Sequence, residues 1–403
     1  MSFDSTDRSL LRRIWALSWP MVVYNALEMT VGLVDLLMVR PFGPAATAAI
    51  GLSRQVTFLV EASAIAIATG VITLVSQGIG ARAPSQVNNV ARQSFYLVLI
   101  LGLPATLIGY LCCHALLVGM HASPDTIAYG EPYLQVYFSG IVFLWANVVA
   151  AAIFRGAGDV MTPLKLAVGI NLLNVVLNYV FIHGAGPIPA FEVQGAAMGT
   201  VTARAFAAVL YVALLWRRAR NMRLRLGDQS TLSNQNRWGP DWRVIWRVLR
   251  IGVPMALASL LRNGSRLVFL AIVGASVLGV SFHAAIGVGL QVRLLSILPA
   301  LAFQTAAATL VGQAIGRGDL KDAEGLGRRS VQLLAVIMLV VVVMIIALAD
   351  PLAALLIDSP ESAALGAKVL RWFAVAQLFS ALSIGTQGAL MGAGDTAPAL
   401  RYT

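Results

Sequence analysis

The stretch TLVSQGIG at residues 73–80 returns as TLVGQAIG at residues 309–316, which is 236 positions further along the chain. Shorter matches with the same separation are GAGD at 156–159 and 392–395, and AAIG at 48–51 and 284–287. Each match alone would be weak. Three matches at one separation, spread over more than a hundred residues, indicate that the chain consists of two related halves.

The composition points to the membrane. Of the 403 residues, 58% are hydrophobic and only 12% are charged, and the mean hydropathy is +0.79. Soluble domains carry about 25% charged residues, so we expect an all-α protein that crosses the bilayer many times. Ten spans of sufficient length are predicted at residues 14–39, 46–77, 93–118, 129–154, 162–183, 195–216, 248–274, 279–312, 330–349 and 366–391.

Lysine and arginine fix the expected orientation. If the N-terminus is cytoplasmic, 21 of the 29 basic residues fall in inward loops and ends, and three fall in outward ones. This bias predicts an N-terminus inside. It also accounts for the net charge of +11, because the most basic segment would lie at the anionic cytoplasmic leaflet. We therefore expect no nucleic-acid partner.

The duplication predicts two lobes with the same orientation, because an even number of spans in each half returns the chain to its starting side. We expect a first lobe of six helices at residues 1–216, a basic linker at 217–246 and a second lobe at 247–403. Counterparts of the last two helices of the first lobe would fall beyond the end of the sequence. The second lobe is thus expected to be incomplete, with four helices and the start of a fifth, in a C-terminally truncated chain.

Asp35 lies in the apolar run VGLVDLLMV at residues 31–39. A charge at the bilayer centre costs about 2.5–3.5 kcal/mol on insertion scales, so such a residue is a candidate functional site. Its counterpart in the second half carries no charge, which favours a function over shared structural support. The alternative is that Asp35 only pairs with a buried arginine such as Arg204.

Other charged and polar residues also lie within predicted membrane spans, where their burial costs free energy. Glu28 lies two helical turns before Asp35 on the same face, and Glu61 lies in the second span. In the fifth span, Asn174 and Asn178 share a face and Asn171 joins them, either as interhelical hydrogen-bonding residues or as a polar wall beside Asp35. Arg262 and Arg266 lie in a second half without a deep acid, where they could line a hydrated cavity or bridge to the first half.

The sequence contains no motif for nucleotide binding, for zinc-dependent proteolysis or for metal binding. There is no GxxxxGK[ST], no HExxH and no metal-ligand spacing, and the two cysteines are adjacent in an apolar run. GAGD is interpreted as a glycine turn at a helix end. We expect neither an enzyme nor a bound cofactor or metal.

The motifs together resemble the multidrug and toxic compound extrusion (MATE) family in its bacterial form. They are VGLVD at 31–35, TLVSQGIG at 73–80, RGAGDVMTPL at 155–164, NLLNVVLNYVF at 171–181, VQGAAMGT at 193–200, TLVGQAIGRGDLKDAE at 309–324 and LMGAGDT at 390–396. The resemblance covers the whole chain. It implies two six-helix lobes around a V-shaped cavity, and a monomeric antiporter of the inner membrane that exports organic, often cationic compounds against H⁺ or Na⁺.

The resemblance also implies an ion-coupling site at Asp35, Asn174, Asn178 and Thr200, to which Glu28 is added as a neighbour. Glu61, Arg262 and Arg266 are expected to line the substrate cavity. Two departures stand out: an acid that some members carry near Asn178 is missing, and the usual VGRLG after the first acid reads VRPFG at 39–43. The coupling ion therefore stays open between H⁺ and Na⁺.

A flippase of lipid-linked saccharides in the same superfamily is the alternative function. It would need a cationic, lipid-sized groove, and the arginines at 262 and 266 leave this alternative open. A major-facilitator carrier would show a DRxGRR-like loop, which is absent. A membrane-embedded enzyme would need catalytic groups at one depth, and the sequence offers none.

Overall fold

The computed structural model describes residues 5–226, 239–274, 286–287, 289–290, 292–293, 296–356 and 359–401. Within these residues the chain is helical apart from turns and one isolated bridge, Ala185 to Ile188. The first lobe contains α1 (Ser5–Val39), the short η1 (Arg40–Phe42), α2 (Pro44–Gly80), α3 (Pro84–Gly119), α4 (Pro124–Ser139), α5 (Ile141–Gly156), α6 (Met161–His183) and α7 (Glu192–Leu226). The second contains α8 (Trp242–Gly274), α10 (Leu298–Gly316), α11 (Leu320–Ala347), α12 (Ala349–Leu356), α13 (Pro360–Ala393) and α14 (Ala397–Arg401).

The described helices agree with the expected membrane spans. Nine are long and apolar enough to cross a bilayer, and the bent pair α4 and α5 makes a tenth. Most of the early part of the expected span 279–312 lies outside the described residues, and α10 forms its end. The all-helical polytopic fold is thus confirmed. The division at residues 217–246 stays a prediction: α7 continues to Leu226, α8 begins at Trp242, and residues 227–238 lie outside the described part.

The two halves keep their register in the helices. Gly80 ends α2 and Gly316 ends α10, again 236 positions apart. Pro124 begins α4 and Pro360 begins α13 at the same separation, and each follows a serine whose hydroxyl caps the helix, Ser123 or Ser359. A Ser-Pro pair is a strong helix start, because the serine accepts an orphan N–H and proline needs no donor. The duplication therefore extends to where helices begin and end.

One helix differs between the halves. The first lobe breaks it at Gly140, where α4 and α5 meet at 53°, and the second lobe continues it through Ala376 as the single helix α13. Gly140 lies against α7, where an added Cβ would come within 2.4 Å of Val201. Glycine thus lets α7 approach at the bend, and the unbent copy has no such requirement.

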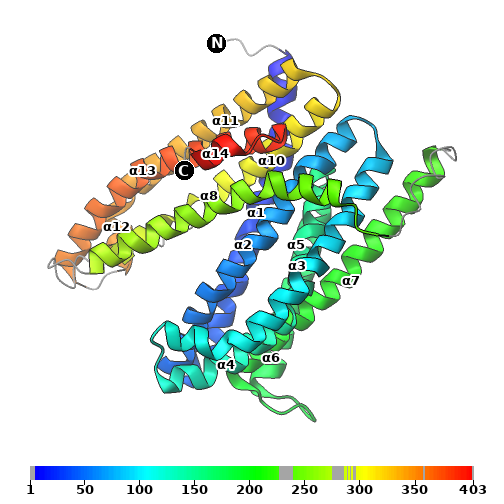
Figure 1. Cartoon of the computed structure of the whole chain (residues 1–403). Coiled ribbons are helices and arrows are strands. Elements are labelled where there is room, and N and C mark those ends of the chain that lie inside the picture. Colours follow the sequence, from blue (N-terminus) through cyan, green and yellow to red (C-terminus); the bar gives the residue numbers. More distant parts are fainter. Residues whose placement is uncertain are drawn as a thin grey trace.

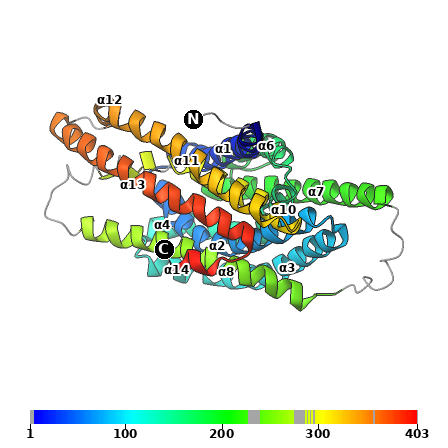
Figure 2. The same ribbon diagram turned by 90° about the horizontal axis from the view of Figure 1, so that it is seen from above.

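The two bundles meet at one end and diverge at the other (Figure 1), and the view from above shows α13 crossing over α2 (Figure 2). Helix α2 contacts α8 and α10 of the second lobe, and α1 contacts α10. The diverging ends are those of α4 and of α12 with the start of α13.

Ser76 and Gly312 are matching residues of the two halves, and they face each other where α2 meets α10. Both are buried, and a Cβ on Gly312 would come within 2.0 Å of the Ser76 hydroxyl. Two matching residues can meet only on the pseudo-symmetry axis. The space there holds one side chain, which explains why TLVSQGIG and TLVGQAIG differ at this position.

Candidate functional site

Asp35 of α1 is buried, 9% exposed, against α6. Its Oδ1 accepts a hydrogen bond of 2.6 Å from the side-chain amide of Asn178, which is itself fully buried. The second oxygen, Oδ2, has no hydrogen-bond partner among the described residues, and Asp35 forms no ion pair with them. A carboxyl in this state can take up a proton or a cation at Oδ2.

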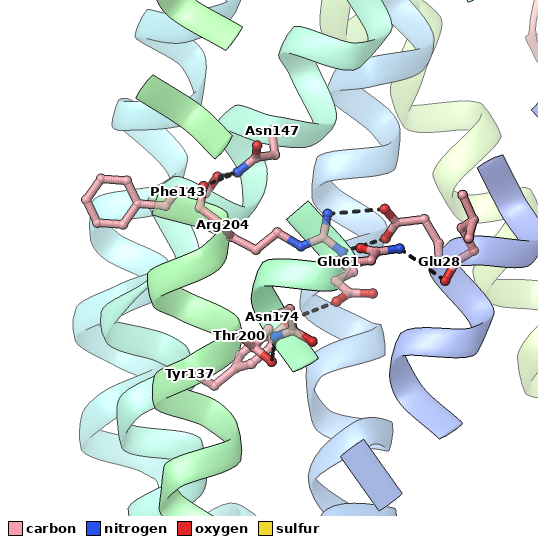
Figure 3. Close-up of polar contacts among 10 residues, drawn as sticks. Glu28, Glu61, Tyr137, Phe143, Asn147, Asn174, Thr200 and Arg204 are labelled. Atoms are coloured by element: carbon pink, nitrogen blue, oxygen red, sulfur yellow. Dashed lines mark hydrogen bonds and ion pairs between the residues drawn. The ribbon is translucent and has the colours of Figure 1, made fainter. Parts of the chain in front are cut away.

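The polar chain continues from Asn178 to α7. Asn174 and Asn178 exchange hydrogen bonds of 3.3 and 3.4 Å through their side-chain amides, as their spacing of four residues allows. The Asn174 amide also donates to the Thr200 hydroxyl at 3.1 Å (Figure 3). The structure therefore brings together Asp35, Asn174, Asn178 and Thr200 from three helices. Asn171 lies apart and donates to the Leu27 carbonyl of α1 at 3.3 Å.

Arg54 of α2 supplies a positive charge near Asp35. Its guanidinium lies over Gly32, where an added Cβ would overlap the guanidinium nitrogen, and Gly32 is three residues before Asp35 on the same face. Arg54 and Asp35 form no ion pair, so the guanidinium is a neighbouring positive charge and not a hydrogen-bonded partner of the carboxylate. The sequence pattern does not place Arg54 beside Asp35, because that position depends on how α1 packs on α2.

Arg204 pairs with Glu28 and not with Asp35. Its two terminal nitrogens donate to the two Glu28 oxygens at 2.6 and 3.2 Å (Figure 3). The side chains are 18% and 29% exposed. A bidentate arginine–carboxylate pair in this setting is held firmly, so Glu28 already has a counter-ion. The alternative that Asp35 serves as the partner of Arg204 is wrong.

A cavity of about 150 Å³ lies beside this ion pair inside the first lobe. Glu61 lines it and accepts a hydrogen bond of 2.5 Å from the Tyr137 hydroxyl (Figure 3). Aromatic rings of Tyr24, Trp145 and Tyr211 form part of the wall.

Two buried polar atoms on the same wall have no hydrogen-bond partner among the described residues, the indole N–H of Trp145 and the side-chain oxygen of Asn147. The lining also includes the ion pair of Glu28 and Arg204, so the cavity offers the Glu61 carboxylate and aromatic faces beside a pair of charges that balance each other. These groups suit a small organic cation that also carries polar atoms.

The expected arginines of the second lobe lie elsewhere. Arg262 of α8 donates to the side-chain oxygen of Gln387 on α13 at 3.0 Å, and it does not line the cavity that holds Glu61. The side chain of Arg266 lies outside the described residues. Sequence reasoning missed Tyr137 as the partner of Glu61, because nothing in a chain separation of 76 residues signals the contact.

A family model described as MatE matches residues 20–180 and 254–403, more than half of the chain. The chain belongs to the MatE family. Over 96% of its length this MatE chain is 27% identical to a probable multidrug resistance protein NorM of Thermotoga maritima, covering 81% of that protein. It is 26% identical to a probable multidrug resistance protein YpnP of Bacillus subtilis, covering 98% of the chain and 85% of the relative.

Solved structures of MATE transporters resemble this MatE chain throughout. An outward-facing MATE transporter of the MOP superfamily superposes with a TM-score of 0.85 at 25% identity, covering 96% of this chain and 84% of that one. Relatives and structures are transporters, so the MatE chain is a multi-pass membrane transporter and not an enzyme.

Proposed function

We propose that the MatE chain is a secondary active antiporter that exports organic, often cationic compounds in exchange for H⁺ or Na⁺. The observation that supports this most is Asp35, a buried carboxylate with an amide partner and no ion pair. Burial disfavours the charged form of a carboxyl unless a proton or cation neutralises it. Glu28 already has Arg204 as its counter-ion. It would therefore contribute to the ion-coupling site as a charge fixed by Arg204, next to the exchangeable carboxylate of Asp35.

Either ion fits the chemistry of the group. A proton needs one carboxyl oxygen, and Oδ2 of Asp35 has no hydrogen bond among the described residues. Sodium would need several oxygen ligands, which the side chains of Asp35, Asn174, Asn178 and Thr200 contain. The ion drives transport only if it binds more tightly to one conformation of the lobes than to the other.

The substrate would enter between the lobes and reach the cavity of the first lobe, with Glu61 as the counter-ion for its positive group. The names of the NorM and YpnP relatives support export of several drugs. Arg262 and Arg266 keep their proposed place on the substrate path in the second lobe. We place the protein in the bacterial inner membrane as a monomer with a cytoplasmic N-terminus, which the basic inward loops support.

The test is dye export from liposomes that contain the purified chain, under an imposed pH gradient or an imposed Na⁺ gradient. One of the two gradients should drive export, and Asp35→Asn should abolish the response while dye binding persists. Asp125→Asn is the matched control, because it makes the same chemical change at an exposed helix start. Export by Asp35→Asn at the normal rate would overturn the proposal. Movement of a fluorescent lipid-linked saccharide without dye export would favour the flippase.

A further inference from the structure

Four hydrogen bonds join the lobes in two matching pairs. The Thr73 hydroxyl donates to the Met391 carbonyl at 2.8 Å, with the Thr69 carbonyl of its own helix at 3.1 Å. The matching Thr309 hydroxyl shares its proton between the Arg155 carbonyl at 3.1 Å and the Thr305 carbonyl of its own helix at 3.0 Å. The Gln77 amide donates to the Gly392 carbonyl at 3.1 Å, and the matching Gln313 amide donates to the Gly156 carbonyl at 3.4 Å. Every donor and every acceptor is 236 positions from its counterpart. Each repeated TLV motif therefore holds the helix end that leads into the GAGD turn of the other lobe.

Two glycines bring the helices close enough for these bonds. A Cβ on Gly80 would come within 2.0 Å of the Gln313 carbonyl, and a Cβ on Gly316 would come within 2.0 Å of the Gln77 carbonyl. Any side chain at either position would push α2 and α10 apart. The threonine side chains are almost fully buried, at 0% for Thr73 and 1% for Thr309, so water does not compete for their hydrogen bonds.

These contacts join the C-terminal ends of α2, α5, α10 and α13, and the two bundles meet at one end and diverge at the other (Figure 1). The helix ends and loops at this end carry Arg82, Arg155 and Arg317, which the charge bias assigns to the cytoplasm. At the opposite end the helices diverge. The bonds thus occupy the path by which a compound would enter from the cytoplasm.

From this geometry we infer that Thr73, Gln77, Thr309 and Gln313 form an inter-lobe clasp that closes the cytoplasmic entrance of the transporter, and that inward opening requires these hydrogen bonds to break together. The inference rests on the proposed function, because a closing device matters only if the lobes alternate between two openings. The four residues position the lobes, and they belong neither to the hydrogen-bonded group at Asp35 nor to the lining of the cavity that holds Glu61.

The clasp is symmetric, so its two sides should matter equally. Thr73→Val and Thr309→Val keep the shape of the side chain and remove the donor. Loss of one such hydrogen bond should raise the inward-open population about fivefold. Thr73→Ser and Thr309→Ser retain the hydroxyl and should restore the original population. Gly80→Ala and Gly316→Ala should open the entrance further, because a methyl group there overlaps a carbonyl.

The measurement is the distance between spin labels at Asn88→Cys on α3 and Glu324→Cys on α11, which are matching positions near the clasp. The background would carry Cys112→Ala and Cys113→Ala. The valine and alanine variants should enlarge the long-distance fraction. Gly325→Ala is the matched control, because no atom lies within 4 Å of its added Cβ. A second label pair inside one lobe, at Glu324→Cys and Lys368→Cys, should stay unchanged unless the lobe itself unfolds.

The inference is overturned if the clasp variants leave the inter-lobe distance as it was, if Gly325→Ala changes it equally, or if only the pair within one lobe changes. Unequal effects of Thr73→Val and Thr309→Val would contradict the prediction that the two sides of the clasp contribute equally. The distances need no ion gradient and no substrate. They therefore test the clasp even if Asp35→Asn leaves export intact, a result that would overturn only the proposed coupling.

Discussion

Glu28 and Asp35 lie two turns apart on one face of α1, yet the fold gives them different partners. Glu28 receives both arms of Arg204, and Asp35 receives a neutral amide from Asn178. A carboxylate with a bidentate arginine keeps its charge, whereas one with an amide partner can be neutralised by a proton or a cation. The residues that contact them therefore make Glu28 a structural charge and Asp35 a carboxylate that can exchange an ion.

The amide that contacts Asp35 should matter more than the amide behind it. Asn178→Ala removes a hydrogen bond to a charged group, a bond worth about 1.5–3 kcal/mol. We expect the ion concentration that gives half-maximal export to change at least tenfold in this variant. Asn174→Ala should change it less, since Asn174 reaches Asp35 only through Asn178. Equal effects of the two substitutions would show that the direct contact is not what matters.

The pair of Glu28 and Arg204 should contribute to stability. Glu28→Gln leaves the guanidinium without its counter-ion, and we expect a loss of roughly 2–3 kcal/mol, less than for a fully buried pair because both side chains are partly exposed. Thermal unfolding in detergent measures this loss. The double variant Glu28→Gln/Arg204→Gln should be less destabilised than the two single changes added together. Additive losses would mean that the two charges do not interact.

At the scale of elements, the bend between α4 and α5 depends on one glycine. Gly140→Ala places a methyl group within 2.4 Å of Val201 on α7, and overpacking of this kind costs about 1–3 kcal/mol. Thermal unfolding should show that loss. Adding Val201→Ala should recover part of it, because it vacates the space that the methyl group needs. A Gly140→Ala variant as stable as the parent would show that α7 can move away without cost.

Sequence alone predicted the spans, their parallel repeat and the residues near Asp35, because each leaves a periodic or local trace. Hydropathy marks a span, a fixed separation marks a duplication, and the spacing of Asn174 and Asn178 places them on one face. It could not predict the partner of Arg204 or the bond from Tyr137 to Glu61. These contacts join residues 176 and 76 positions apart and depend on how helices pack. The bend at Gly140 could not be predicted either, since many membrane helices contain glycine without bending.

At the scale of the whole molecule, the meeting of Ser76 and Gly312 predicts a specific exchange. Gly312→Ser alone would place two serines in space for one, so we expect a loss of about 1–3 kcal/mol from overpacking and a wider separation of the lobes. The double variant Ser76→Gly/Gly312→Ser moves the serine side chain from α2 to α10 and leaves one side chain at the contact. It should therefore regain most of the stability that Gly312→Ser loses. Melting temperatures of the parent and of these two variants decide this, and a double variant no more stable than Gly312→Ser would contradict it.

A residue on a two-fold axis meets its own copy when the two halves are identical chains. A homodimer built from either half would place serine against serine or glycine against glycine at this point, with too much volume in the first case and a void in the second. A fused chain escapes that constraint, because its halves can carry different residues at one place. Here a single serine fills the axis, which suggests a cost for any attempt to rebuild the transporter from two copies of one lobe.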